Sequence, residues 1–392
     1  MVIYSAERLR KIRVVVTGGG TGGHTYPALT TIRTLRARLA VAGTEPELLW
    51  VGVAQGLEAK VARQEGIPFK AIVTGKLRRS PNLRELGRNV ADAFRIPLGI
   101  LQAVLIVLRT RPAVVLSTGG YVSVPIGIAA WATRRPLVMH EQTLTVGLAN
   151  RILARIATRV LLSHESSVDH LPERAKGRAV VTGNPIRPEI LAGDRGRALE
   201  AYRFDPQLPL VYVTGGAQGA VQVNNLIAEI LPDLLPGCQV LHQCGEYSFD
   251  RMRQVADGLP GHLRERYRVV DYVHGDMPDV LAAADIVVAR SGAGTVAELT
   301  ALGKACIFIP LIPTGGDEQR QTARHLAEAG AARMVAGADA TPARLREEIV
   351  TLLQHPDRRR QLADAAWQHG RPDAAAAVAT ALLDAAGRYG PA

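Results

Sequence analysis

The glycine-rich run at residues 18–23, followed directly by His24, has the clearest chemical potential in the sequence. It comes after the apolar run Val14–Val16, which is typical of a buried strand, and before a stretch with helical spacing of apolar residues. Glycines at such a turn let a phosphate approach the backbone, and the helix start supplies free N–H groups. An imidazole beside them is a suitable general base near neutral pH. A helix-capping or phosphate-positioning role for His24 is the alternative.

Two further glycine loops occur in the second half of the chain. Residues 215–219 follow the apolar run Leu210–Thr214, and residues 290–294 follow Ile286–Ala289. Glu298 lies about one turn inside the helix expected after the second loop. A carboxylate there could accept both hydroxyls of a ribose, or it could simply complement the helix dipole. Two such loops in one domain suit a nucleotide diphosphate better than a single phosphate.

Glu141 is a second carboxylate in a site-like position, because it follows the expected strand Leu137–Met139. Ligands of open α/β sheets bind beyond the carboxyl ends of the strands. We therefore name His24 and Glu141 as the catalytic candidates.

The run at 18–23 also matches the dinucleotide fingerprint G-x-G-x-x-G formally. That fingerprint needs an acidic residue at the end of the next strand, to hold the ribose. The next expected strand, Leu48–Val51, is followed by Gly-Val-Ala-Gln, which contains no carboxylate. A NAD(P)-dependent oxidoreductase is therefore disfavoured.

Several other classes of site lack their motifs. The three cysteines (Cys238, Cys244 and Cys306) have neither a disulfide nor a zinc spacing, and the sequence contains no D-x-D motif and no P-loop. We therefore expect no metal and no other cofactor. Aromatic residues make up only 4% of the chain, so stacking platforms for single-stranded nucleic acid are not expected. We predict no nucleic-acid partner.

The net charge of +11 is concentrated in the first half of the chain. Residues 1–165 hold 23 Lys and Arg against 9 Asp and Glu, whereas the remainder holds 24 against 27. Within this half, the segment 76–111 alternates eight basic residues with apolar ones. Apolar side chains framed by cations suit docking on an anionic membrane surface, and a core helix with an exposed Arg face is the alternative. The apolar stretch Ile96–Leu108 is too short to span a bilayer, which needs about 20 residues.

Short apolar runs alternate with helical stretches along the whole chain, which indicates doubly wound α/β sheets. The pattern restarts after Pro185. We expect two Rossmann-like domains facing across a cleft, at 1–185 and 186–371. An alanine-rich helix within 372–392, with Pro372 at its first position, is expected to pack back on the first domain. The expected strands are Val14–Val16, Leu48–Val51, Val114–Leu116, Leu137–Met139, Val160–Leu162, Leu210–Thr214, Val240–His242, Arg268–Val270, Ile286–Ala289 and Cys306–Ile309.

Six motifs occur in an order that resembles one enzyme family. They are Gly19-Gly20-Thr21-Gly22-Gly23-His24, Gly119-Gly120-Tyr121-Val122-Ser123, His140-Glu141-Gln142, Gly183-Asn184-Pro185-Ile186-Arg187, Gly215-Gly216-Ala217-Gln218-Gly219 and Arg290-Ser291-Gly292-Ala293. This pattern is similar to the MurG family of UDP-N-acetylglucosamine transferases, which convert lipid I to lipid II in peptidoglycan synthesis. The resemblance runs from about residue 12 to about residue 335.

The resemblance implies a GT-B fold and an inverting, metal-independent transfer from UDP-GlcNAc to the C4 hydroxyl of undecaprenyl-diphospho-MurNAc-pentapeptide. It implies that the first domain takes the lipid-linked acceptor at the cytoplasmic face of the cell membrane, as a peripheral protein. The second domain would bind UDP-GlcNAc. A cell-wall synthesis complex is a further possible partner.

Site residues are carried over by motif, with His24 as the base. The residues implied at the acceptor are Gly119, Gly120, Tyr121 and Gln142, with Ser123 nearby. Those implied at the donor are Thr21, Gly22, Gly23, Thr143, Arg187, Ala217, Gln218, Val273, Ala293, Gly294, Thr295, Val296, Ala297, Glu298 and Gln319. Val273 would offer its backbone to the uracil, and Gln319 would contact the sugar.

Three positions depart from the family pattern. Thr143 and Thr322 stand where the family has Asn, and Ala217 stands where it has Ser. Each change removes a polar contact worth about 0.5–1.5 kcal/mol. Two alternatives therefore stay open beside the oxidoreductase: a related transferase acting on another lipid acceptor, such as diacylglycerol or a natural-product lipid, and a non-catalytic lipid-surface protein.

Overall fold

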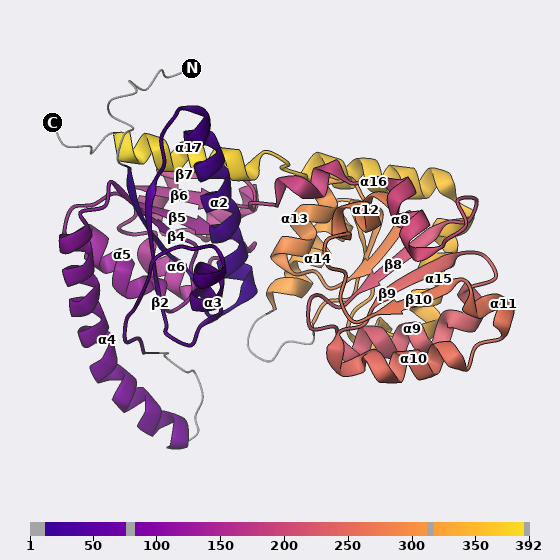
Figure 1. Cartoon of the computed structure of the whole chain (residues 1–392). Helices are drawn as coiled ribbons and strands as arrows, with labels where there is room; N and C mark the ends of the chain where they lie inside the picture. Colours follow the sequence, from indigo (N-terminus) through magenta and orange to yellow (C-terminus); the bar gives the residue numbers. More distant parts are fainter. Residues whose placement is uncertain (1–11, 76–82, 312–316, 388–392) are drawn as a thin grey trace. The chain divides into compact units, whose positions relative to one another are not determined.

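The computed structural model describes residues 12–75, 83–311 and 317–387, with the side chains of 83–94 left aside. The chain forms two compact units (Figure 1). Unit 1 comprises Met1–Pro185 together with Asp373–Ala392, and unit 2 comprises Ile186–Pro372. Each is described separately below.

Unit 1 is built on a seven-stranded parallel sheet with the order β3-β2-β1-β4-β5-β6-β7. The strands are β1 (Arg13–Thr17), β2 (Glu47–Gly52), β3 (Phe69–Ala71), β4 (Val114–Ser117), β5 (Leu137–Glu141), β6 (Arg159–Leu162) and β7 (Ala179–Val181). Their central members are apolar on both sides, since both faces of the sheet are covered.

Helices cover the two faces of this sheet and form two apolar clusters. They are α2 (Gly22–Val41), α3 (Leu57–Gln64), α4 (Leu83–Thr110), α5 (Ser123–Ala132), α6 (Leu148–Leu153), α7 (Glu173–Lys176) and α17 (Ala374–Gly387). Val14 and Val16 pack with α2, α3 and α17 on one face. Val15 points the other way and packs with α4, α5 and α6. This alternation follows from the two-residue period of a strand.

Unit 2 contains a six-stranded parallel sheet with the order β10-β9-β8-β11-β12-β13. The strands are β8 (Leu210–Thr214), β9 (Gln239–Gln243), β10 (Tyr267–Val270), β11 (Ile286–Ala289), β12 (Cys306–Phe308) and β13 (Arg333–Met334). The helices are α8 (Arg195–Tyr202), α9 (Val221–Leu234), α10 (Phe249–Asp257), α11 (Gly261–Arg264), α12 (Met277–Ala283), α13 (Ala293–Ala301), α14 (Glu318–Glu328), α15 (Pro342–Gln354) and α16 (Pro356–His369). The doubly wound α/β architecture predicted from the sequence is confirmed in both units.

The strand order of each sheet reverses next to its first strand. In unit 1 the chain moves outward from β1 to β3 and then returns to β4 beside β1. In unit 2 it moves from β8 to β10 and returns to β11 beside β8. Helices that follow the two central strands therefore lie on opposite faces, which leaves a crevice at the carboxyl edge. The glycine loops after β1, β4, β8 and β11 all lie at these two switch points.

Two sequence-based expectations about elements were incomplete. The three short strands β3, β7 and β13 were missed, because each lies at a sheet edge with half-exposed residues and so lacks a continuous apolar run. The C-terminal helix packs against α2 in unit 1, as Figure 1 shows. However, it begins at Ala374, and the carbonyl of Asp373 accepts the first helical hydrogen bond, so Pro372 precedes the helix instead of opening it.

Candidate functional site

The switch point of unit 1 brings together two glycine loops and His24. Thr21 is the N-cap of α2, so Gly22, Gly23 and His24 form its first turn. The loop after β4 folds tightly over them, since Gly120 has φ of +83°. A Cβ at this position would lie 2.4 Å from the carbonyl oxygen of Gly19 and 3.3 Å from Cδ2 of His24. Only glycine fits there without displacing the backbone of Gly19.

Below the first loop lies a buried carboxylate, Glu58 of α3, which the sequence analysis did not identify. It accepts hydrogen bonds from the backbone N–H groups of Val53 (3.0 Å) and Gly20 (3.3 Å). A Cβ at Gly19 would lie 2.3 Å from the carboxylate carbon. Glu58 therefore holds the backbone of the 18–23 loop in shape. The sequence signal was weak, because Glu58 looks like an ordinary first-turn acid of a helix.

His24 is connected to β5 by side-chain hydrogen bonds. Its Nδ1 lies 3.0 Å from Oε1 of Gln142, whose Nε2 lies 3.0 Å from Nδ1 of His140. Nε2 of His140 lies 2.9 Å from the carbonyl oxygen of Gly183. Thr118 donates from its hydroxyl to the backbone carbonyl of His24 at 2.8 Å. The base candidate is therefore held at both its backbone and its ring.

Glu141 has a different environment from the one expected of a proton-transfer group. It is buried, and Oε1 accepts a hydrogen bond from the N–H of Thr143 at 3.0 Å. The Thr143 hydroxyl oxygen lies 2.8 Å from the same Oε1 and 2.7 Å from the carbonyl oxygen of Thr145, so these two acceptors share its single proton. Oε2 accepts from the N–H of Gly147 (3.0 Å) and from Nδ2 of Asn150 (2.9 Å). Because three N–H donors hold the carboxylate, we propose that Glu141 shapes the 142–147 loop. Thr143, expected at the donor, faces this carboxylate.

In unit 2 the loop at 215–219 runs from β8 to α9. The candidates Ala217 and Gln218 are exposed at its tip, and α9 begins after Ala220, whose side chain cannot cap it. Gln243 at the end of β9 orders this region: its Nε2 donates to the carbonyl of Gly216 at 3.0 Å, and its Oε1 accepts from the N–H of Val273 at 2.9 Å. Any contact of the Val273 backbone with a uracil would thus use its carbonyl oxygen. Gln243 is not among the site residues expected from the sequence.

The loop at 290–294 places the other donor candidates at the start of α13. Gly292 is the N-cap, and the first turns contain Ala293, Gly294, Thr295, Val296 and Ala297, with no acid in the first turn. Glu298 follows, and its Oε1 accepts from Nε (3.2 Å) and Nη2 (3.1 Å) of Arg187. Burial raises the pKa of Glu298, whereas the Arg187 guanidinium opposes that shift. The two predicted donor residues are therefore brought together.

Gln319 and Thr322 lie on α14, next to this loop. Gln319 accepts from the hydroxyl of Ser291 with its backbone carbonyl (2.8 Å) and from the N–H of Leu311 with Oε1 (3.0 Å). The Thr322 hydroxyl donates to the carbonyl of Glu318, one turn earlier in its own helix, at 2.9 Å. Thr322 is buried, so this departure from the family pattern is satisfied locally.

The helix starts at the switch points can stabilise an anion. The first turns of α2, α9 and α13 contain no acidic residue, and no side chain caps their N-termini. Their free N–H groups and partial positive charge suit phosphate oxygens. Among the described residues, no three His, Cys, Asp or Glu side chains are grouped to hold a metal ion.

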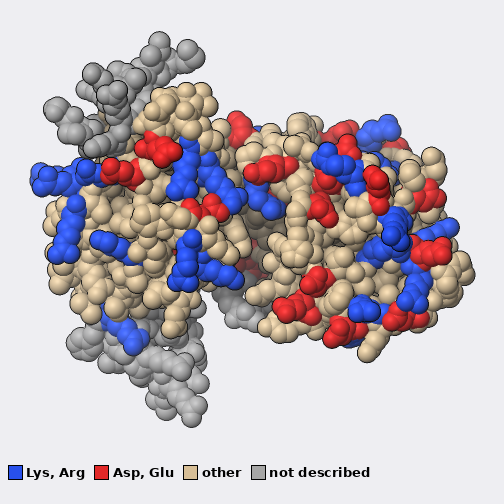
Figure 2. All heavy atoms as spheres, in the orientation of Figure 1, with Lys and Arg blue, Asp and Glu red and all other residues tan. Residues whose placement is uncertain are grey.

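Helix α4 carries an exposed apolar stripe at Leu98, Leu101, Leu105 and Leu108, spaced three or four residues apart. The basic residues Lys76, Arg78 and Arg79 of the segment 76–111 lie outside the described residues. In Figure 2, Lys and Arg are more abundant than Asp and Glu on the face shown of unit 1, whereas unit 2 displays both signs. Within the part of the chain that is described, no helix has the length and apolar character to cross a bilayer.

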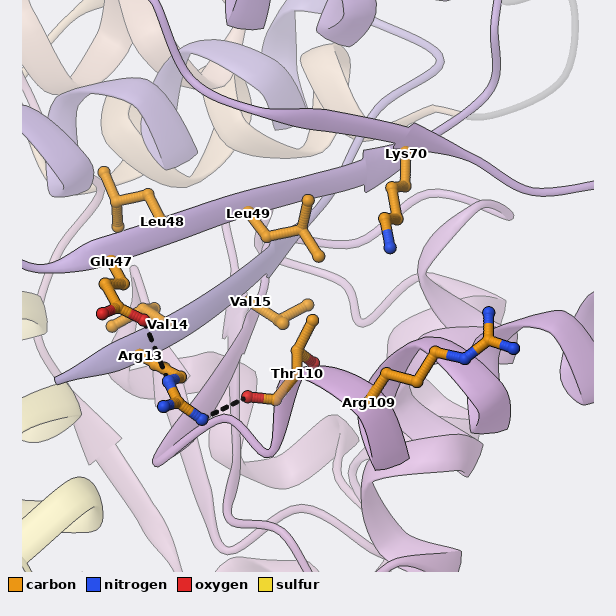
Figure 3. A pocket seen from close by; sticks show the side chains of 9 residues that line it. All are labelled: Arg13, Val14, Val15, Glu47, Leu48, Leu49, Lys70, Arg109 and Thr110. Carbon is orange, nitrogen blue, oxygen red and sulfur yellow. Dashed lines mark hydrogen bonds and ion pairs between the residues drawn. The ribbon is translucent and has the colours of Figure 1, made fainter. Parts of the chain in front are cut away.

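A hollow of about 430 Å³ lies beside the C-terminal turn of α4 (Figure 3). Its lining includes Val15 and Leu49 of the sheet and the basic side chains Arg13, Lys70 and Arg109. Arg13 is paired with Glu47 at 2.9 Å and donates to the carbonyl of Thr110 at 3.1 Å. None of the candidate site residues lines this hollow.

The chain matches two family models. Residues 14–162 match the glycosyltransferase family 28 N-terminal domain, and residues 210–378 match the C-terminal domain of the same family. Both matches include the glycine loops at the switch points, and the N-terminal match also includes His24.

Named relatives agree with these matches. The chain is 36% identical to the UDP-N-acetylglucosamine–N-acetylmuramyl-(pentapeptide) pyrophosphoryl-undecaprenol N-acetylglucosamine transferase 2 of Bacillus cereus, over 76% of this chain and 79% of that protein. It is 34% identical to the corresponding transferase of Treponema pallidum, over 94% of each chain. The crystal structure of Acinetobacter baumannii MurG has the same fold, with a TM-score of 0.76, 24% identity, and coverage of 95% of this chain and 99% of that one.

Proposed function

This chain belongs to glycosyltransferase family 28, and from that membership we propose that it transfers GlcNAc from UDP-GlcNAc to the C4 hydroxyl of undecaprenyl-diphospho-MurNAc-pentapeptide. This is the conversion of lipid I to lipid II in peptidoglycan synthesis. The observation that carries the proposal is His24 at a sheet switch point of unit 1, where Gln142 bonds its imidazole and Thr118 bonds its backbone carbonyl. The relatives that span nearly the whole chain carry this activity in their names.

His24 acts as the general base in the proposed reaction. Its ring takes the proton of the acceptor C4 hydroxyl while that oxygen forms a bond to the anomeric carbon of GlcNAc. The bond from this carbon to UDP breaks on the opposite face, so the configuration inverts and UDP leaves with the bonding electrons. A positioned base of this kind contributes about 10²–10⁴-fold to the rate.

Unit 2 holds the nucleotide in this proposal. The N-termini of α9 and α13 supply N–H groups to the diphosphate, whose negative charge grows as the bond to the sugar breaks. Glu298 accepts the ribose hydroxyls, and Arg187, which pairs with it, supplies positive charge beside it. The loops around Thr21–Gly23 and Gln319 contact the sugar, and Gly119 to Tyr121 approach the acceptor diphosphate. No metal ion has a role in these steps.

The apolar stripe of α4 is proposed to dock unit 1 on an anionic lipid surface, at the cytoplasmic face of the cell membrane. The four leucines of the stripe are between 43% and 57% exposed, which is unusual for side chains of this size on one helix face. Arg95 and Arg109 lie on the same helix and are exposed. Cations that frame an apolar stripe add about 1 kcal/mol each near an anionic leaflet.

The transfer is tested by measuring UDP release from UDP-GlcNAc with and without a lipid-linked MurNAc-pentapeptide. We expect release that depends on this acceptor, a β-linked product by NMR coupling constants, and an unchanged rate in EDTA. Release with diacylglycerol but not with the MurNAc lipid would reject the proposed acceptor. Complete loss of activity in EDTA would reject the metal-independent mechanism.

Membrane docking is tested by sedimentation with vesicles of phosphatidylglycerol and phosphatidylcholine. We expect binding that weakens as salt rises, and weaker binding of the double variant Leu101→Gln/Leu105→Gln. Leu191→Gln is the matched control, because Leu191 is similarly exposed (44%) but lies in unit 2. Vesicle binding that does not change with salt concentration, or that is equally strong in the α4 double variant, would refute docking through the apolar stripe.

A further inference from the structure

Four polar groups of unit 1 form a continuous chain from His24 to the backbone of Gly183. The links are His24 Nδ1 to Gln142 Oε1 (3.0 Å), Gln142 Nε2 to His140 Nδ1 (3.0 Å), and His140 Nε2 to the carbonyl oxygen of Gly183 (2.9 Å). Gln142 and His140 are 2% and 0% exposed, so the two inner bonds are shielded from bulk water, while the bond to the half-buried His24 lies at the outer end of the chain. Each link in such a chain restricts which atom of its neighbour carries a proton.

The far end of the chain determines the tautomer of His140. A backbone carbonyl can only accept a hydrogen bond, so Nε2 of His140 carries the proton that is shared with Gly183. Burial lowers the pKa of His140, which keeps the ring neutral. A neutral imidazole has one N–H, and Nδ1 of His140 is therefore an acceptor. The atom of Gln142 that faces it must be a donor.

The orientation of the Gln142 amide has a second, independent determinant. Its nitrogen also lies 3.1 Å from the backbone carbonyl oxygen of His140, which again can only accept. Two acceptors thus meet Nε2, and Oε1 is the atom left to face His24. An amide oxygen can only accept, so the ring atom opposite it, Nδ1 of His24, must donate.

We propose that Gln142 sets the tautomer of His24, so that Nδ1 holds the proton and Nε2 presents its lone pair as the base. This inference rests on the proposed function, in which His24 removes the acceptor proton. The same bond persists after Nε2 is protonated, because Nδ1 still carries its hydrogen in the imidazolium. Gln142 is therefore a positioning residue, and the acceptor contact implied for it by family resemblance is replaced by a role inside the protein.

The proposal has a direct readout that does not need activity. In protein labelled with ¹⁵N-histidine, the shifts of protonated and unprotonated ring nitrogens are well separated, and His24→Gln identifies the signals of His24. In the wild type at a pH where His24 is neutral, we expect a protonated Nδ1 and an unprotonated Nε2. A protonated Nε2 there would overturn the proposal, whatever the enzyme's rate.

Removing the amide supplies the second test. Gln142→Met keeps the length of the side chain but cannot accept from Nδ1, so we expect both tautomers of His24 and a kcat about 10-fold lower, with unchanged affinity for UDP. Gln239→Met is the matched control, because Gln239 is also buried (1% exposed), bonded through both ends of its amide, and located in unit 2. It should leave the tautomer and kcat unchanged. A single His24 tautomer in Gln142→Met would contradict the proposal.

A third variant separates the links of the chain. In His140→Phe the backbone carbonyl of residue 140 still holds the Gln142 nitrogen, so we expect a smaller loss of kcat than in Gln142→Met. An equal or larger loss, in a folded variant, would mean that Gln142 is not the controlling link. If His24→Gln itself kept full activity while the tautomer was as expected, the proposed base would fail and the tautomer assignment would stand.

Discussion

The two switch points of this protein have the same sheet order and similar helix starts, but they carry different functional side chains. In unit 1 the polar side chains are engaged within the protein: Glu58 holds one glycine loop, and Gln142 holds His24. In unit 2 the starts of α9 and α13 have no acidic residue in the first turn and no side-chain cap, and α13 also carries Glu298, which pairs with Arg187. A reacting base needs a rigid, dry surrounding, whereas a charged ligand needs donors that the protein has not used. The same strand order thus serves two tasks.

The base in unit 1 is expected to give the largest effect. His24→Ala should lower kcat by about 10²–10⁴-fold, because the variant lacks the imidazole proposed to take the acceptor proton, while UDP affinity stays unchanged. Stopped assays with saturating donor and acceptor measure the first quantity, and calorimetry with UDP measures the second. His170→Ala is the control, since His170 is exposed on the surface of the same unit. Unchanged turnover of His24→Ala would show that the switch point of unit 1 does not supply the base through His24.

Replacing Glu298 in unit 2 should weaken the binding of UDP. Glu298→Ala is expected to raise the Kd for UDP about 10–100-fold, which corresponds to losing charge-assisted hydrogen bonds to the ribose. The exposed acid Glu347 on α15 provides the control variant Glu347→Ala. Calorimetry with UDP and with uracil separates ribose contacts from base contacts. Equal UDP affinity in Glu298→Ala and wild type would place the nucleotide elsewhere.

Glu58 tests how rigid the loop of unit 1 must be. Glu58→Ala leaves the N–H groups of Gly20 and Val53 without their acceptor, so we expect a loss of about 1–3 kcal/mol in the free energy of unfolding. It should also lower kcat without changing UDP affinity. Denaturant titration and steady-state kinetics measure the two effects. A weaker UDP affinity in this variant would contradict the assignment of the two tasks to separate units.

A pH dependence of stability in unit 2 is expected away from both sites, and at neutral pH it has no effect. His242 is buried between Tyr267 and Asn224, and burial lowers its pKa from 6.5 to about 3. Below pH 6.5 the unfolded chain binds a proton that the folded chain does not, so stability falls as the pH decreases toward about 3, on the order of 1 kcal/mol per pH unit. His242→Gln should show a shallower decline between pH 6 and 4. An equal slope would mean that other groups control acid unfolding.

Most of the central strands could be predicted, because both faces of a parallel sheet are buried and each strand is then a short apolar run. The edge strands β3, β7 and β13 could not, since one side of each is exposed and their residues carry no such pattern. The glycine loops and His24 were recognisable for a similar reason: a tight turn that approaches a ligand requires glycine in consecutive positions. These features depend on a few neighbouring residues.

The sequence by itself determined the local pieces of this protein: the central strands of both sheets, the glycine loops that follow them, and the residue types able to hold a phosphate or take a proton. Only the tertiary structure decided their partners. Gln142 meets His24 across 118 residues, and Arg187 meets Glu298 across 111. The tertiary structure also showed that three N–H donors hold the Glu141 carboxylate, and that Glu58 supports a loop. Proton positions and the roles of carboxylates depend on which dipoles face them, and folding brings those dipoles from distant parts of the chain.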